Sequence, residues 1–175
     1  LNMEDPVIGG YSKEKIALRR AIGMGYNIID EIGVVRQGQG VPATQPIPPN
    51  LPGHDPNAKR PYPYDPVSSR ALLDRFGYKD CDGDGFRELP DCTPLVLKYS
   101  NDSSEINRQF NELWKKSMDA IGIKIEFIQQ KWPDTLKAAK AGKVMMWGLG
   151  GAAAVRDGEQ FLTQLNMPAF GAGWT

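Results

Sequence analysis

One segment, residues 95–127, decides the fold and reads LVLKYSNDSSEINRQFNELWKKSMDAIGIKIEF. Its first five residues alternate like a strand, and Ser103 or Ser104 can then cap a helix. Gly122 stands where a helix commonly ends, and residues 123–127 alternate again like a second strand. Between cap and glycine, apolar residues recur at steps of three and four: Ile106, Phe110, Leu113, Trp114, Met118 and Ile121.

Helical and extended patterns also alternate on both sides of this segment. Such alternation predicts an α/β fold in which helices cover a sheet. We expect the whole chain, residues 1–175, to form a single α/β lobe. The further elements expected are strands at 1–4 and 143–147 and helices at 12–24, 66–76, 133–139 and 158–165.

A proline-rich stretch separates the first two predicted helices. Nine prolines fall between Pro42 and Pro66, so neither a helix nor a central strand can run through it. Loops this long are usually functional or serve as linkers. Tyr62 and Tyr64 within the stretch favour packing onto the body of the protein instead.

Composition excludes several classes of protein. The 21 basic and 21 acidic residues cancel, and no Lys/Arg-rich stripe appears, so nucleic acid is not an expected partner. No apolar run approaches the roughly 18 residues of a membrane span. The N-terminal residues lack the basic and hydrophobic regions of a secretion signal; if the protein is exported, we expect its signal outside this chain.

An acidic, glycine-rich loop follows the helix at 66–76. Calcium loops of the EF-hand type place ligands at positions 1, 3, 5, 9 and 12 and a glycine at the sharp turn. Gly85 matches the turn, but the strand pattern after residue 92 departs from the helix that an EF-hand requires. The alternative is that Asp and Gly here simply build tight turns. The ligand positions fall on Asp80, Asp82, Asp84, Glu88 and Asp91.

The only two cysteines, Cys81 and Cys92, bracket this loop. Their number and closeness predict one short-range disulfide formed in an oxidising compartment. Two free thiols or two zinc ligands are the alternatives. Zinc has little support, because His54 is the sole histidine and there is no CxxC pair.

The sequence offers few residues that could form a catalytic site. His54 lies among turn formers, no G-x-S-x-G elbow is present, and the acidic residues cluster in one loop instead of facing each other. No GxGxxG or GxxxxGK[ST] motif occurs. We therefore expect a protein that is not an enzyme; a hydrolase or transferase of α/β fold is the disfavoured alternative.

The stretch after the last predicted strand is the candidate ligand site. In α/β folds ligands meet the loops at strand ends, and this loop is rich in small residues that let a ligand approach the backbone. Trp147 could equally be a core aromatic, and Arg156 with Asp157 a solvated helix start. The candidate residues are Trp147, Gly148, Gly150, Ala154, Arg156 and Asp157.

Together these stretches resemble the family 5 extracellular solute-binding proteins, the peptide, nickel and related solute receptors of ABC importers. The resemblance covers nearly the whole chain, and its specificity lies in the order and spacing of its parts. They are Leu18–Ile22, Gly38–Ala43, Pro46–Pro49, Tyr64–Pro66, Ala71–Leu73, Gly77–Tyr78, Asp82–Glu88, Pro94–Leu95, Trp114, Gly122–Ile123, Gly142–Lys143, Asp157 and Phe161–Leu162.

The resemblance implies a two-lobed receptor of the periplasmic-binding-protein type, periplasmic or on the cell surface, that closes on a peptide or small solute by hinge motion. This chain resembles the inserted second lobe only. An ABC permease in the membrane is the implied protein partner, no cofactor is implied, and a monomer is expected. A calcium-binding interaction module built on the Asp80–Asp91 loop is the alternative function.

At one position the sequence departs from the family. In peptide-binding members an Asp pairs with the free amine of the ligand, and the corresponding residue here is Ala154. Burying an ammonium without a partner costs several kcal/mol. We therefore expect a free peptide amine to be disfavoured at this spot, where Trp147 and Arg156 suit an apolar or anionic group, unless Asp157 or the other lobe supplies the carboxylate.

Overall fold

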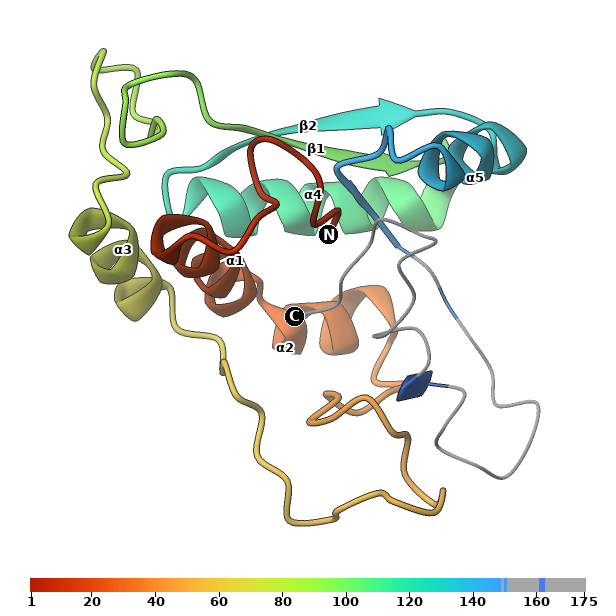
Figure 1. The fold of residues 1–175 in the computed structure, drawn as a ribbon. Helices are drawn as coiled ribbons and strands as arrows, with labels where there is room; N and C mark the ends of the chain where they lie inside the picture. The colour runs from red at the N-terminus through yellow and green to blue at the C-terminus, as the bar shows by residue number, and fades with distance from the viewer. Residues whose placement is uncertain (149, 151–160, 163–175) are drawn as a thin grey trace.

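The computed structural model describes residues 1–148, 150, 161 and 162 (Figure 1). Within them, three parallel strands and their connecting helices form an α/β layer structure, which confirms the predicted fold class. The elements in chain order are α1 (Lys13–Gly25), α2 (Ile28–Asp30), the π-helix η1 (Glu31–Val35), α3 (Pro66–Arg75), β1 (Val96–Asn101), α4 (Glu105–Asp119), β2 (Lys124–Gln129), α5 (Trp132–Lys140) and β3 (Met146–Trp147).

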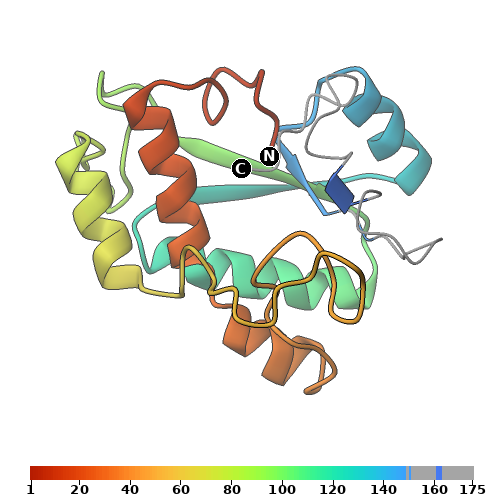
Figure 2. The ribbon, with the colours of Figure 1, turned by 60° about the horizontal axis from the view of Figure 1, so that its bottom comes forward.

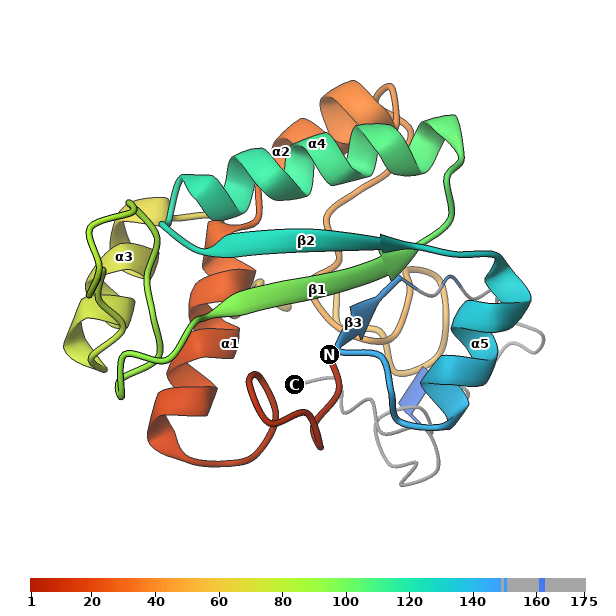
Figure 3. The same cartoon turned by 90° about the horizontal axis from the view of Figure 1, so that it is seen from above.

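The sheet has the strand order β2-β1-β3, with β1 in the centre. Val96 pairs with Lys124 at the start of the β1–β2 ladder, and Tyr99 pairs with Met146 on the other side. The chain passes from β1 through α4 to β2, then through α5 across to β3. Helices α4 and α1 lie on one face of the sheet, as the view onto the opposite face shows (Figure 3).

The hydrophobic core lies between the sheet and these helices. Leu97 of β1 is fully buried there, together with Met118 and Ile121 at the end of α4 and Leu18 of α1. Helix α3 packs along α1 and adds Leu73 to the same cluster. The apolar stripe predicted in residues 106–121 therefore faces the core from Phe110 onward, whereas Ile106 at its start is exposed.

Local chemistry sets the helix boundaries close to their predicted positions. Ser12 caps α1, with its hydroxyl accepting from the Lys15 N–H, and Asp65 caps α3 by accepting from the Ser68 N–H at 2.9 Å. Gly77 and Gly122 follow α3 and α4 with φ of 84° and 73°, a conformation that glycine adopts without steric cost.

The strand predicted at residues 1–4 is wrong. The residues form turns, and the Asn2 N–H donates to the Met145 carbonyl at 2.9 Å without continuing into a ladder. The side chains of Asn2 and Asp5 instead accept hydrogen bonds from the N–H groups of Glu4 and Val7. Side chains that satisfy their own backbone in this way favour turns over a sheet ladder.

The last strand is shorter than predicted and begins at Met146. The Lys98 N–H of the central strand donates to the Met145 sulfur at 3.1 Å, and the Met145 carbonyl is occupied by Asn2. The ladder therefore starts one residue later, between Tyr99 and Met146.

Helical turns at residues 28–35, α2 and η1, were not predicted. The segment is rich in β-branched residues and contains Gly33, which lowers helix propensity. Asn27 supplies the start, because its side chain accepts from the N–H groups of Ile29 and Asp30. This N-cap residue was the sequence signal from which the helical turns could have been predicted.

The proline-rich stretch contains no helix or strand before α3, as predicted, and its C-terminal end lies beside the end of α1. The Asp65 N–H donates to the Met24 carbonyl at 2.9 Å, so the chain leaves the end of α1 and returns beside it (Figure 1). Along the way Tyr62 lies under the Arg20 guanidinium, 5.6 Å from ring centroid to Cζ, which confirms that the stretch packs on the body.

Among the described residues, none of the helices combines the length and apolar character needed to span a bilayer. Of the helix predicted at 158–165, only residues 161 and 162 are described, and both are helical.

Candidate functional site

The carboxyl ends of the three parallel strands meet at one edge of the sheet (Figure 3). Asn101, Gln129 and Trp147 are the last residues of β1, β2 and β3. From the central strand β1 the chain passes through α4 to β2 on one side, and then through α5 to β3 on the other side. In open α/β sheets such a switch point is where loops part and ligands bind, so the geometry supports the predicted location of the site.

Two indoles stack at this edge. Trp132 opens α5 directly after β2, Trp147 ends β3, and their rings stack with centroids 5.5 Å apart and planes at 29°. Trp132 is 46% exposed and Trp147 is half-buried. A stacked pair that stays open to solvent offers a flat apolar face to a ligand.

Sequence reasoning predicted Trp147 but missed Trp132. The signal was the same strand-end rule, because Trp132 follows the β2 strand as Trp147 closes β3. Lys131 and Pro133 flank Trp132 and indicate the start of a helix, so the local pattern predicts the helix but not the exposure of the ring.

Gly148 follows Trp147 at a point of close approach. A Cβ at this residue would lie 2.7 Å from the Tyr99 hydroxyl, a distance that atoms do not tolerate. The small residue at position 148 thus makes room for the protein's own Tyr99, and the predicted close approach of a ligand to this loop stays a prediction. Burial, and next the negative charge of Glu31, raises the pKa of Tyr99.

An aromatic chain leads from Tyr99 into the molecule. The centroids of the Tyr99 and Trp114 rings lie 5.5 Å apart, and the centroids of the Trp114 and Tyr26 rings lie 4.2 Å apart. The Tyr26 hydroxyl donates to Glu31 at 2.7 Å, and burial together with this bond raises the pKa of Tyr26. These contacts tie the strand edge to the η1 helix.

Asn101 brings a polar group to the same edge. Its amide donates to the Asn111 side chain at 2.6 Å, but its buried Oδ1 atom accepts no hydrogen bond from the described residues. A buried acceptor without a donor is uncommon in proteins and calls for an explanation.

Of the predicted ligand-binding residues, the structure describes Trp147, Gly148 and Gly150, the two glycines being exposed. Ala154, Arg156 and Asp157 lie outside the described residues, so their roles stay predictions.

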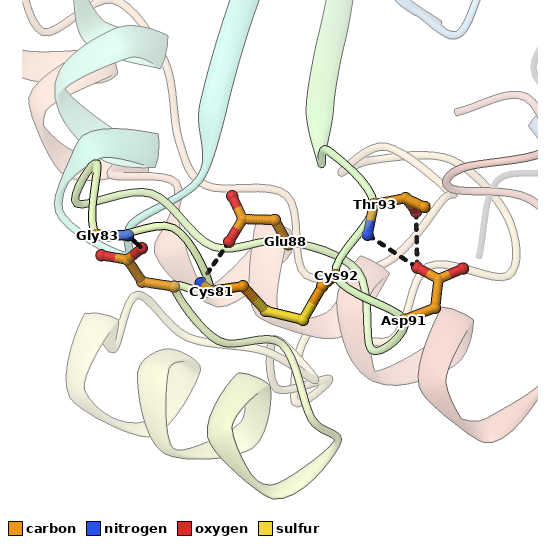
Figure 4. The surroundings of a disulfide bond; sticks show 7 residues. Cys81, Gly83, Glu88, Asp91, Cys92 and Thr93 are labelled. Carbon is orange, nitrogen blue, oxygen red and sulfur yellow. Dashed lines mark hydrogen bonds between the residues drawn. A yellow bond between two sulfur atoms is a disulfide. The ribbon is translucent and has the colours of Figure 1, made fainter.

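The acidic loop lies away from this edge, between α3 and β1, and is closed by a disulfide (Figure 4). Cys81 and Cys92 are bonded, with their Cα atoms 5.9 Å apart, which confirms the predicted link. The alternatives of free thiols and of zinc ligands are thereby excluded.

The carboxylates of the loop mostly bind backbone. Asp80 accepts from the N–H groups of Gly83 and Gly85 at 2.6 and 3.0 Å, and the largely buried Glu88 accepts from the Cys81 N–H at 2.7 Å. Asp82 and Asp84 each accept from the N–H two residues further on. These are the bonds that the tight-turn interpretation requires.

Three of the five predicted calcium ligands come together. One carboxylate oxygen each of Asp80, Asp82 and Glu88 lies within 4.8 Å of the others, and Asp84 and Asp91 are not in that group. Asp91 instead accepts from the hydroxyl and the N–H of Thr93, bonds that lower its pKa (Figure 4). The five-ligand arrangement of an EF-type loop is therefore not formed, and calcium binding stays a prediction.

Comparison with known protein families gives one match that covers nearly the whole chain. The family described as "Bacterial extracellular solute-binding proteins, family 5 Middle" matches residues 2–171. Among curated proteins, "Di/tripeptide-binding protein 2" of Pseudomonas aeruginosa is 34% identical over 148 residues, which is 83% of this chain and 26% of that protein. "Heme-binding protein A" of Haemophilus influenzae is 28% identical and covers 87% of this chain and 26% of that protein.

Solved structures show the same fold. The periplasmic binding protein DppA of Helicobacter pylori, in complex with the peptide STSA, superposes with a TM-score of 0.74 at 26% identity, over 93% of this chain and 28% of that one. NikA of Brucella suis, in complex with Fe(III)-EDTA, gives a TM-score of 0.76 at 22% identity, over 89% of this chain and 31% of that one. The chain thus spans about a quarter of the length of the curated relatives it matches.

Proposed function

Because this chain belongs to the family 5 bacterial extracellular solute-binding proteins, we propose that it is the part of an ABC importer's receptor that captures a solute at the carboxyl edge of its sheet. Capture involves no covalent chemistry. The single observation that carries the proposal is the stacked, solvent-open pair of Trp132 and Trp147 at the strand ends.

The chemistry of the edge favours a ligand with a flat or apolar group. Two indoles can stack on an aromatic or aliphatic side chain, and such contacts contribute roughly 0.5–1.5 kcal/mol beyond burial. The exposed backbone of Gly148 adds polar atoms nearby. A short peptide with an apolar or aromatic side chain supplies both kinds of partner.

We propose the rest of the receptor's action from what the family resemblance implies. Affinity in hinge-closing receptors comes from burying the ligand between two lobes, so this chain alone binds its solute weakly. The receptor works as a monomer in the periplasm or outside the cell and delivers its solute to a membrane permease. Peptides with a blocked N-terminus bind better than free ones if Ala154 faces the amine; amine-dependent binding would contradict that part.

Calorimetry with two tripeptides tests the role of the indoles. We expect this chain to bind Ala-Phe-Ala more tightly than Ala-Ala-Ala, and we expect Trp132→Ala and Trp147→Ala each to weaken Ala-Phe-Ala by about tenfold, or about 1.4 kcal/mol. Tyr11→Ala is the matched control, because Tyr11 is 78% exposed and remote from the strand ends in the chain. Equal affinities of wild type and both tryptophan variants for Ala-Phe-Ala would refute the proposal.

A further inference from the structure

The hydroxyl of Tyr99 reaches the backbone at the end of β3. Tyr99 pairs with Met146 in the register of β1 and β3, and paired residues of a parallel ladder project to the same face of the sheet. Because side chains alternate along a strand, Trp147 belongs to the opposite face and position 148 returns to the face of Tyr99. A Cβ at Gly148 would lie 2.7 Å from the Tyr99 hydroxyl oxygen. The hydroxyl therefore occupies the space in which a side chain of residue 148 would begin.

Glycine at position 148 places no side chain over this hydroxyl. Gly148 is exposed, and Tyr99 is half-buried. Among the described residues, the Tyr99 hydroxyl has ring neighbours but no hydrogen-bond partner. A tyrosine in such surroundings normally places its O–H group on an acceptor. An O–H donor is therefore available at the carboxyl edge of the sheet.

The ring that carries this donor is held in place by its neighbours. On the same face of the sheet, the centroid of Tyr99 lies 5.5 Å from that of Trp114 on α4 and 6.4 Å from that of Phe127 on β2. Burial, followed by the negative charge of Glu31, raises the pKa of Tyr99, so the hydroxyl keeps its proton at neutral pH. The position of the donor is thus set before a ligand arrives, which lowers the entropic cost of binding.

The indole pair and this hydroxyl lie on opposite faces of the same strand end. Trp147 pairs with Ser100 and stacks on Trp132 of α5, whereas Tyr99 packs toward α4. In Figure 2 the end of β3 lies between α5 and α4. A solute that crosses the exposed backbone at Gly148 therefore meets an apolar surface on one side and an O–H donor on the other.

We propose that Tyr99 is a specificity-determining residue of the solute site, and that its hydroxyl donates a hydrogen bond to a carbonyl or carboxylate oxygen of the solute beside Gly148. A peptide backbone is the chemical class that fits, because it offers a carbonyl oxygen at every residue whatever the side chain. The peptide identity of the solute depends on the proposed function, in which the indoles select the side chain. Tyr99 binds the backbone.

Nuclear magnetic resonance of this chain, labelled with ¹³Cζ-tyrosine and titrated with Ala-Ala-Ala at neutral pH, tests the contact. Tyr99→Phe identifies the Tyr99 signal, because it removes that one of the six tyrosine signals. We expect the signal to move downfield and to saturate, since donation of the phenol proton shifts Cζ toward its value in the phenolate. The signal of the exposed Tyr11 should stay in place.

Affinities of variants separate the hydroxyl from the indoles. Tyr99→Phe removes the hydroxyl and keeps the ring, so it should weaken Ala-Ala-Ala and Ala-Phe-Ala by the same factor, about three- to tenfold. Trp147→Ala should weaken Ala-Phe-Ala far more than Ala-Ala-Ala. The matched control Tyr11→Phe, which removes an exposed hydroxyl just before α1, should leave both affinities unchanged.

Gly148→Ala tests the geometry, because its Cβ would lie against the Tyr99 hydroxyl. We expect it to weaken Ala-Ala-Ala in the wild-type protein and to have little further effect in Tyr99→Phe, where the oxygen is absent. Such non-additive effects are typical of residues in contact. A Tyr99 signal that Ala-Ala-Ala does not move, wild-type affinity of Tyr99→Phe, or additive effects of the two variants would overturn the proposal. Loss of the preference for Ala-Phe-Ala with the Tyr99 response intact would contradict the proposed role of the indoles and leave this contact standing.

Discussion

Removal of the Cys81–Cys92 disulfide, as the double variant Cys81→Ser/Cys92→Ser, should destabilise the protein by a predictable amount. The two residues are 11 apart in sequence. In the chain-entropy treatment a disulfide that closes a loop of this size lowers the entropy of the unfolded chain by about 9 cal/mol/K. This corresponds to about 2.8 kcal/mol of stability at 25 °C.

The folded loop itself should survive the change. The Arg87 N–H donates to the Gly122 carbonyl at 2.7 Å, and the Glu88 N–H donates to the Lys79 carbonyl at 2.9 Å. Because these bonds do not depend on the sulfur atoms, the folded loop keeps its structure. The protein loses stability because the unfolded chain gains conformational entropy.

Urea unfolding followed by circular dichroism measures this loss. A decrease of about 2.8 kcal/mol lowers the midpoint by about 1.4 M if m is about 2 kcal/mol/M, and lowers Tm by about 6–11 °C. Wild type unfolded in a reducing agent is the matched control and should coincide with the variant. A variant that unfolds at the same urea concentration as oxidised wild type would refute the entropic reasoning.

Three further changes test the core, a turn and a buried hydroxyl. Leu97→Ala, at a side chain with no exposed surface, should lower the free energy of unfolding by about 2–5 kcal/mol in urea titrations, and a loss under about 1 kcal/mol would contradict its place in the core. Gly122→Ala should cost more than Gly10→Ala in the same assay: both have positive φ, but a Cβ at Gly122 would lie 3.3 Å from Arg87 Nε whereas nothing lies within 4 Å at Gly10, and equal costs would remove the contact argument. Burial, and next the charge of Glu14, raises the pKa of Tyr78 to about 12, above the roughly 10 of an unfolded tyrosine, so its contribution to stability is complete below about pH 10 and is lost as the pH rises through about 12. Tyrosinate absorbance and unfolding should therefore rise together in that window, and ionisation of all tyrosines near pH 10 in a folded protein would contradict it.

Sequence patterns predicted the amphipathic elements well. The stripe of α4 and the alternation of β2 are strong signals because one face of each is buried or partly buried and the other is exposed to solvent. The strand at residues 1–4 failed because side chains of Asn2 and Asp5 compete for the backbone, a local effect that periodicity does not report.

The candidate site was predictable only in part, for a different reason. Strand-end reasoning places Trp147 correctly, but the pairing with Trp132 depends on how far α5 tilts across the sheet, which no single segment encodes. The contact of the Arg36 guanidinium with the Phe110 ring was unpredictable for the same reason, because the two residues meet only when η1, a segment without helical periodicity, packs on α4.

The hydrogen bond from the Asp65 N–H to the Met24 carbonyl brings the chain back to the end of α1. Residues 25–64 therefore form an excursion that starts and finishes at the same point of the fold. Helices α1 and α3 pack together and would remain neighbours if everything between them were exchanged, because the excursion begins and ends at one place. That excursion carries η1 and the proline-rich stretch, whereas the sheet, the core beneath it and the indole pair lie outside it. A receptor built this way can change one excursion of its chain while the sheet, its core and the indoles proposed to meet the solute keep their places.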